Sequence, residues 1–218
     1  ISYMPTYIQM VTGYTATESG YQMLPLIIGM MTTSVIVMRR VAATGYYRWL
    51  PAMGMTVVVV ALGLLATITP GMPIWRLWIY LAVMGIGLGM GMQLLVLIAQ
   101  NQFPMQYVGT ATAANTYFRQ MGSSLGAAVV GSLFVSRLTD LVTDRLPGLA
   151  TVSGGGDVSS LTPAIVRSLP SAAQNIIIGA YNDALTPVFL MMIPLVLFSA
   201  VLLAFLWEKP LRQSTERP

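Results

Sequence analysis

The polar residues that best suggest a function lie within an otherwise apolar stretch, residues 109–135. Arg119 stands near its centre, and five uncharged polar side chains recur around it at three- and four-residue steps: Thr112, Asn115, Thr116, Gln120 and Ser123. In an α-helix these steps place side chains on one face. Such a face, with one guanidinium among hydrogen-bonding groups, suits the binding of a polar or charged group rather than a chemical reaction.

Arg119 lies about 15 Å inside the apolar stretch if the stretch is helical. An ionisable side chain at that depth in a membrane is costly unless it is paired or hydrated, and it is a functional-site hypothesis by default. Two interpretations stay open. The guanidinium faces a substrate cavity, or it is a structural clamp that bonds backbone carbonyls or reaches toward the cytoplasm. Gln93, on a neighbouring apolar stretch, either adds to the same cavity or bonds helix to helix.

Enzymatic chemistry is not expected from this sequence. It contains no Cys and no His, so thiolate and imidazole metal ligands, cysteine nucleophiles and histidine bases are missing. No nucleophile–base pair can be assembled from the remaining residues. We therefore expect a protein that binds or passes molecules, with no metal and no cofactor.

The composition places the chain in a lipid bilayer. Of its 218 residues 56% are hydrophobic and 8% are charged, whereas a soluble domain carries about 25% charged residues. A helix needs about 20 apolar residues to cross a membrane. Five stretches meet that length, 20–38, 49–68, 77–98, 109–135 and 184–207, and residues 1–10 resemble the end of a sixth. The sequence predicts an all-α, polytopic membrane helical bundle over residues 1–207.

The basic residues predict how the bundle is oriented. Arg39, Arg40 and Arg48 share one side with the basic tail at 208–218, and short cytoplasmic loops hold the excess of Lys and Arg. That side is predicted to be cytoplasmic, C-terminus included, in a multi-pass protein of the cell inner (plasma) membrane. A long loop at about 138–183 would then be extracytoplasmic. Within it, Leu138, Leu141, Val142 and Arg145 continue the helical period of the preceding apolar stretch. Pro163 and Pro170 are typical of helix starts.

Glycines at four-residue spacing mark two of the predicted spans. One span contains Gly85, Gly87, Gly89 and Gly91, and another contains Gly122 and Gly126. Small residues let helix backbones approach closely in a membrane. The pattern predicts packed helices; a further possibility left open is that these faces let helices slide or bend during a transport cycle.

Several sequence segments together resemble a known family. They are YMPTYIQ (3–9), GYTATESG (13–20), TGYYRWLP (44–51), GIGLGMGMQ (85–93), GTAT (109–112) and FRQMGSSLG (118–126). In this order and spacing the chain resembles the C-terminal half of the fourteen-span drug:proton antiporters of the major facilitator superfamily. The segment 39–48 resembles the gating loop of that half, but it has no acidic residue.

The resemblance implies a function for the longer protein of which this chain would be the C-terminal piece. It implies a secondary active efflux transporter that exports apolar or amphipathic compounds, with proton antiport. Its expected partners are the lipid bilayer, a small amphipathic substrate, protons and the missing N-terminal half of the same polypeptide, with no nucleic acid. An alternative from a different class remains: a truncated or partner membrane protein whose glycine faces serve helix association without transport.

Overall fold

The structure is a computed structural model that describes residues 3–145 and 163–205. Every regular element in this part of the chain is helical, as the sequence predicts. The elements are α1 (Met4–Thr12), α2 (Ala16–Gln22), α3 (Leu24–Thr44), α4 (Leu50–Leu65), α5 (Ile74–Gln102), a short 3-10 helix η1 (Met105–Tyr107), α6 (Val108–Arg145), α8 (Pro163–Ser168) and α9 (Ser171–Ala204).

Proline and glycine set many of the helix boundaries. Pro5, Pro25 and Pro51 lie in the first turns of α1, α3 and α4, where the missing N–H of proline costs no helical hydrogen bond. Gly13 and Gly45 follow the ends of α1 and α3 with positive φ angles of 75° and 74°, a conformation that only glycine adopts without strain. The turns between helices are therefore encoded locally.

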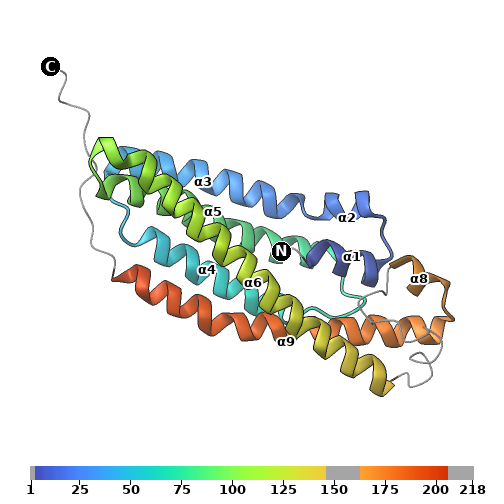
Figure 1. Ribbon diagram of the computed structural model, residues 1–218. Helices are drawn as coiled ribbons and strands as arrows, with labels where there is room; N and C mark the ends of the chain where they lie inside the picture. Colours follow the sequence, from blue (N-terminus) through green and yellow to red (C-terminus); the bar gives the residue numbers. More distant parts are fainter. Residues whose placement is uncertain (1–2, 146–162, 206–218) are drawn as a thin grey trace.

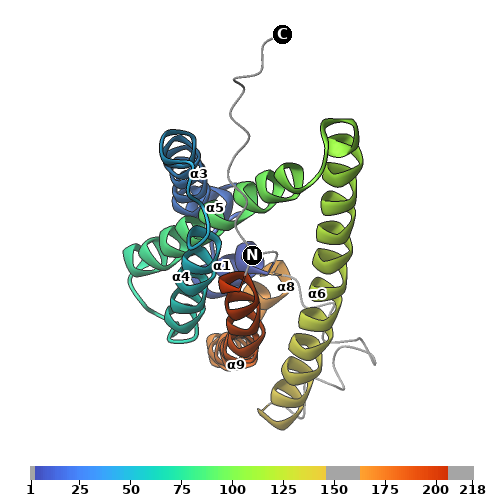
Figure 2. The ribbon, with the colours of Figure 1, turned by 90° about the vertical axis from the view of Figure 1, so that its left-hand side faces the viewer.

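The long helices run roughly lengthwise and form a bundle with one outlying member (Figure 1). Helix α5 packs against both α3 and α4, and α4 packs against α9. Helix α6 touches α5 near one end and α9 along the other, and in the end-on view it stands to one side of the remaining helices (Figure 2). The long helices thus divide into a tightly packed group and the outlying α6.

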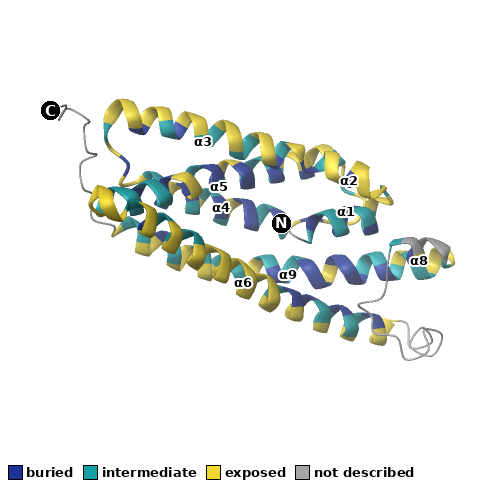
Figure 3. Cartoon of the chain, turned by 45° about the horizontal axis from the view of Figure 1, so that its top comes forward, coloured by how far each residue is buried: buried dark blue, intermediate teal, exposed yellow. Residues whose placement is uncertain are grey.

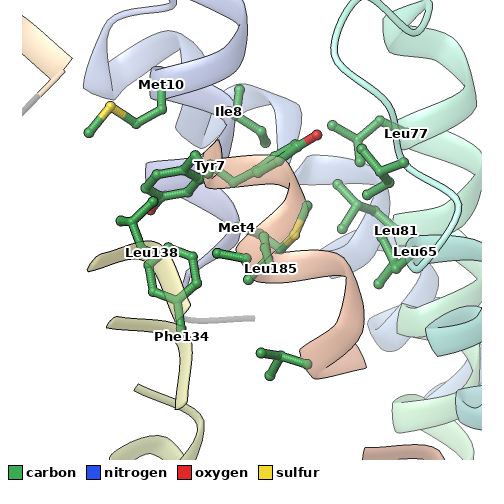
Figure 4. Packing of buried hydrophobic residues seen from close by; sticks show 14 of the residues in the cluster. Met4, Tyr7, Ile8, Met10, Leu65, Leu77, Leu81, Phe134, Leu138 and Leu185 are labelled. Carbon is green, nitrogen blue, oxygen red and sulfur yellow. The ribbon is translucent and has the colours of Figure 1, made fainter. Parts of the chain in front are cut away.

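The larger hydrophobic core lies where α1 enters the bundle. Met4, Tyr7 and Ile8 of α1 are almost fully buried against side chains of α5, α6 and α9, among them Leu81 and Leu185 (Figure 4). A second, smaller cluster lies where α3 and α5 end, and it consists of Val37, Val41, Tyr47, Leu94 and Ile98. Burial of these apolar side chains is the main term that stabilises their positions.

Much of the remaining apolar surface is uncovered. The outward face of α3 and most of the length of α6 are exposed (Figure 3), and Ile28, Met31 and Phe198 are each about 60% exposed. Among the described residues, four helical segments are long and apolar enough to cross a membrane, namely Ala16–Thr44, Ile74–Gln102, Met105–Arg145 and Ser171–Ala204. Such apolar surface suits contact with lipid or with another part of a membrane protein.

The helices differ in extent from the predicted apolar stretches. Within the stretch 49–68, α4 has 16 residues, about 24 Å at the helical rise. Its end at Leu65 is followed by a turn at residues 66–67, ahead of Pro70 and Gly71. Because turn-forming residues close it early, α4 is shorter than the usual crossing length.

Helices also extend into the predicted extracytoplasmic segment at 138–183. Helix α6 continues to Arg145, which confirms the helical period predicted over Leu138 to Arg145, and α9 begins at Ser171. The helix starts predicted at Pro163 and Pro170 are confirmed by α8 and α9. Residues 146–162, Trp207 and the tail 208–218 lie outside the described residues. The helices continue because Leu138, Val142, Ile177 and Tyr181 are buried between them.

Candidate functional site

The polar residues predicted on one helix face all lie on α6. At 100° per residue their Cα positions fall within about 140° of the helix circumference. Thr112, Asn115 and Thr116 are half-buried, whereas Arg119, Gln120 and Ser123 are exposed. The opposite face carries the apolar side chains Tyr117, Met121, Leu125 and Val129, which are 44% to 63% exposed. This part of α6 is therefore amphipathic along its length.

One hydrogen bond ties the polar face to α5. The amide Nε2 of Gln100 donates to Thr112 Oγ1 over 2.9 Å, and the same hydroxyl donates to the carbonyl of Val108 over 2.8 Å. Gln93, also on α5, is exposed, and the structure does not bring it to this pair. The predicted set thus meets α5 at its Thr112 end and is open further along.

Arg119 has no ion-pair partner among the residues that the structure describes. It lies 11 residues beyond the start of α6, about 16 Å along the axis. The ion pair shown in this part of the chain joins Arg145 Nη2 to Asp183 Oδ2 over 2.7 Å, where both side chains are about half-exposed. An exposed guanidinium at this depth in a helix long enough to cross a membrane is available to a substrate or to a partner segment.

The glycines of α5 bring it close to two neighbours. Gly85 and Gly89 lie directly against the backbone carbonyls of Leu26 and Met30 in α3, with no room for a side chain. Gly87 lies against α4, where an added Cβ would be 2.8 Å from the backbone nitrogen of Val58. Because the two sets are offset by two residues, one helix presents a glycine contact to each neighbour.

The glycines of α6 have different surroundings. At Gly122 and Gly126 an added Cβ would meet no atom of the described chain within 4 Å. The packing expected there has no counterpart within residues 3–145 and 163–205, and it stays a prediction about some other segment. Gly131, one turn further, does approach the hydroxyl of Tyr3.

Sequence reasoning missed a buried polar contact between the first and last helices. The hydroxyl of Tyr7 donates to Asn182 Oδ1 over 2.7 Å, with both side chains buried. Tyr3, Phe134 and Tyr181 surround this contact with tilted and edge-on ring contacts, at centroid distances from 4.8 to 6.3 Å. Asn182 lies between the helix start predicted at Pro170 and the apolar stretch 184–207, and no pattern in the sequence pairs it with Tyr7.

An apolar cavity of about 140 Å³ lies between the helices beside this contact. Its lining includes Met4, Leu62, Met84 and Phe189, drawn from α1, α4, α5 and α9. None of the polar residues predicted on α6 lines it. The polar face and this apolar cavity are therefore separate features of the bundle.

The three arginines predicted at the cytoplasmic side lie where α3 passes into α4. Arg39, Arg40 and Arg48 are exposed. The described carboxylates, Glu18, Asp140, Asp144 and Asp183, lie on α2 and on the ends of α6 and α9 that are remote from them (Figure 1). The two ends of the bundle consequently differ in charge.

Comparison with known proteins identifies the family. The model of the Major Facilitator Superfamily matches residues 1–127 of the chain. The chain belongs to the major facilitator superfamily. It is therefore a multi-pass membrane protein of a transporter family, not of an enzyme family. The helical bundle is a fragment of the major facilitator fold.

Individual relatives extend this comparison to almost the whole chain. A major facilitator type transporter of Mycobacterium tuberculosis is 36% identical over 212 residues, which cover 97% of this chain and 30% of the relative. Multidrug resistance protein 3 of Bacillus subtilis is 28% identical over 98% of this chain and 43% of its own length. The efflux pump aunC of Aspergillus niger is 29% identical, over 100% and 41%. This major facilitator chain spans less than half the length of these relatives.

Proposed function

We propose that this chain is the C-terminal part of a secondary active transporter that exports apolar or amphipathic compounds, with proton antiport. The names of two relatives support export, since they are a multidrug resistance protein and an efflux pump. The likeness to fourteen-span drug:proton antiporters supports proton coupling. On this proposal the N-terminal half and the proton-carrying group belong to residues outside this chain.

Arg119 is the observation that carries the proposal. It lies in the middle of an apolar helix, on a face shared with Asn115, Thr116 and Ser123, and no described residue pairs with it. A guanidinium that deep in a membrane needs a partner or water. A cavity between two helical bundles supplies both, and secondary transporters bind their substrates in such cavities near the membrane midplane. We infer that this face of α6 lines the cavity.

The proposal predicts a specific pattern for substitutions at Arg119 in the complete protein. Arg119→Ala should lower export per folded molecule about 30-fold or more, the loss expected when one partner of a desolvated charge pair is removed. Arg119→Lys should restore little, because a point charge does not reproduce the planar fork of donors. Export of cationic, neutral and anionic dyes, with and without an uncoupler, measures the effect.

A matched control separates function from folding. Arg76 also lies on an apolar helix, but it is exposed at the end of α5 beside Trp75, and Arg76→Ala should export normally. If Arg119 is a structural clamp, Arg119→Ala will instead lower the yield and the melting temperature while the surviving protein keeps its activity per molecule. Normal export by folded Arg119→Ala would refute the cavity assignment.

We also propose five crossings within this chain, with α4 as one of them, and a cytoplasmic C-terminus. Support comes from the arginines where α3 passes into α4 and from the mixed charges at the opposite end. Because this chain has no Cys, an introduced thiol reports its own position. A cysteine at Thr143 should react with an impermeant reagent from outside, and one at Ala43 should not, in a background without other cysteines. Labelling of both from one side would contradict the orientation.

A further inference from the structure

The connection between α3 and α4 is held in place by one buried aromatic side chain. Tyr47 is 1% exposed and packs with Val37, Val41, Leu94 and Ile98. Its hydroxyl accepts a hydrogen bond from Asn101 Nδ2 over 3.4 Å. Gly45 ends α3 in the left-handed conformation, and Pro51 begins α4. This short connection, residues 45–49, is therefore fixed at both ends and at its centre.

While Tyr47 is buried, the aromatic residues on either side of it in the sequence are exposed. Tyr46 is 76% exposed and Trp49 is 61% exposed. The guanidinium carbon of Arg48 lies 5.5 Å from the centre of the Trp49 ring, which is a cation–π distance. Two amphipathic aromatic rings and a guanidinium are thus presented together on a connection that cannot easily rearrange.

Two more arginines stand beside this connection. Arg39 and Arg40 are exposed in the last two turns of α3. None of Arg39, Arg40 and Arg48 has a described carboxylate near it, because Glu18, Asp140, Asp144 and Asp183 belong to the other end of the bundle. We call this cluster of Arg39, Arg40 and Arg48 with Tyr46 and Trp49 the arginine–aromatic surface.

The exposed aromatic residues suit a position at the membrane boundary. Exposed Trp and Tyr are enriched where a bilayer meets water. Trp75 and Trp78 mark the opposite end of the bundle on α5, 53% and 42% exposed, as Tyr46 and Trp49 mark this one. We therefore expect the arginines to lie level with lipid headgroups, with the exposed apolar face of α3 continuing from them toward the hydrocarbon.

We propose that the arginine–aromatic surface binds the phosphodiester headgroup of an anionic phospholipid. Guanidinium groups donate paired hydrogen bonds to phosphate oxygens, and basic residues beside membrane helices attract anionic lipid. The Tyr46 and Trp49 rings contact the glycerol region, and the acyl chains lie along α3. Because Tyr47 holds the connection in position, the site is formed before the lipid arrives, which lowers the cost of binding.

Lipid retention by the complete, detergent-purified protein tests this proposal. The protein is titrated with phosphatidylglycerol, with phosphatidylcholine of the same acyl chains and with glycerol 3-phosphate, and bound lipid is counted by native mass spectrometry. We expect phosphatidylglycerol to bind about tenfold more tightly than phosphatidylcholine, and glycerol 3-phosphate to bind weakly. The combined variant Arg39→Gln/Arg40→Gln/Arg48→Gln should lose about 100-fold, at about fivefold for each arginine.

The control variant is Arg76→Gln, which removes an arginine beside Trp75 at the opposite end and should retain phosphatidylglycerol as the parent does. If the combined variant does not fold, single variants with unchanged melting temperatures should each lose about fivefold. The proposal would be overturned if the arginine variants retained phosphatidylglycerol fully, or if phosphatidylcholine bound as tightly as phosphatidylglycerol. It would also be overturned if glycerol 3-phosphate bound as tightly as the lipid, which would indicate a soluble phosphate ligand.

Discussion

Helices α5 and α6 carry the same glycine signature in opposite environments. On α5, Gly85, Gly87 and Gly89 are pressed against the backbones of α3 and α4. On α6, Gly122 and Gly126 face no described atom within 4 Å, and the helix stands apart from the group around α5 (Figure 2). A glycine repeat permits close approach of another backbone, but the neighbouring chain decides whether the approach occurs.

The two helices also differ in how closely they pack and in which polar residues they expose. Helix α5 packs against both α3 and α4, and its glycines at these contacts leave no space for a side chain. Helix α6 carries a polar face that is exposed at Arg119, Gln120 and Ser123. Close backbone packing is therefore found on α5 and exposed polar residues on α6, and the following substitutions test that difference.

The largest effect is expected from a bulky residue in the α5 contact. Gly89→Leu forces a side chain into the carbonyl of Met30 and should destabilise the protein by about 3 kcal/mol or more. Folded yield and melting temperature in detergent measure the loss. Val59→Leu, at a half-buried position of α4, should cost under about 1 kcal/mol. Equal losses of folded yield and melting temperature for the two variants would mean that the close contact at Gly89 is not required for stability.

A smaller effect of opposite sign is expected on α6. Gly122→Ala removes a flexible residue from a helix interior, so it should stabilise the protein by up to about 1 kcal/mol if that face stays open. Thermal melting of the complete protein gives the sign. A clear destabilisation would instead show that another part of the polypeptide packs on Gly122. The glycines of α6 would then be covered in the complete protein, as those of α5 are here.

The smallest effect is expected where the two helices touch. Gln100→Met removes the hydrogen bond to Thr112 but leaves Thr112 bonded to Val108, so the cost should be about 0.5 kcal/mol. Gln102, two residues further on α5, is half-buried and serves as the matched control. Indistinguishable melting temperatures for Gln100→Met and Gln102→Met would show that this bond does not help to hold α6 against α5.

The sequence was most informative about helices and least informative about their ends. Apolar length predicted the long helices, and proline marked the starts of α8 and α9. Helical periodicity predicted that α6 continues past its apolar stretch, but it did not indicate that the helix starting after Pro170 is continuous with the last apolar stretch. Residues of both helices, such as Leu138 and Tyr181, are buried in one cluster, and hydropathy does not register such packing.

For the candidate site, periodicity was enough to place the α6 residues on one face, because helical geometry is local. It did not indicate that Gln93 would lie apart from Thr112, or that Tyr7 would bond Asn182 across 175 positions of sequence. Both depend on how the helices cross, and crossing geometry is set by side-chain packing over many contacts.

By itself, the sequence determined the chemistry that this chain carries: apolar helices, no Cys or His, one arginine within a polar helical face, and glycines at four-residue spacing. These are properties of composition and of short-range periodicity, which each helix expresses independently of its neighbours. Only the tertiary structure decided which glycines are covered by another helix, that Arg119 is exposed, and that the buried Tyr47 fixes the position of the connection that carries Arg48. Those outcomes depend on which helix backbones come together, and that follows from the summed packing of segments distant in sequence.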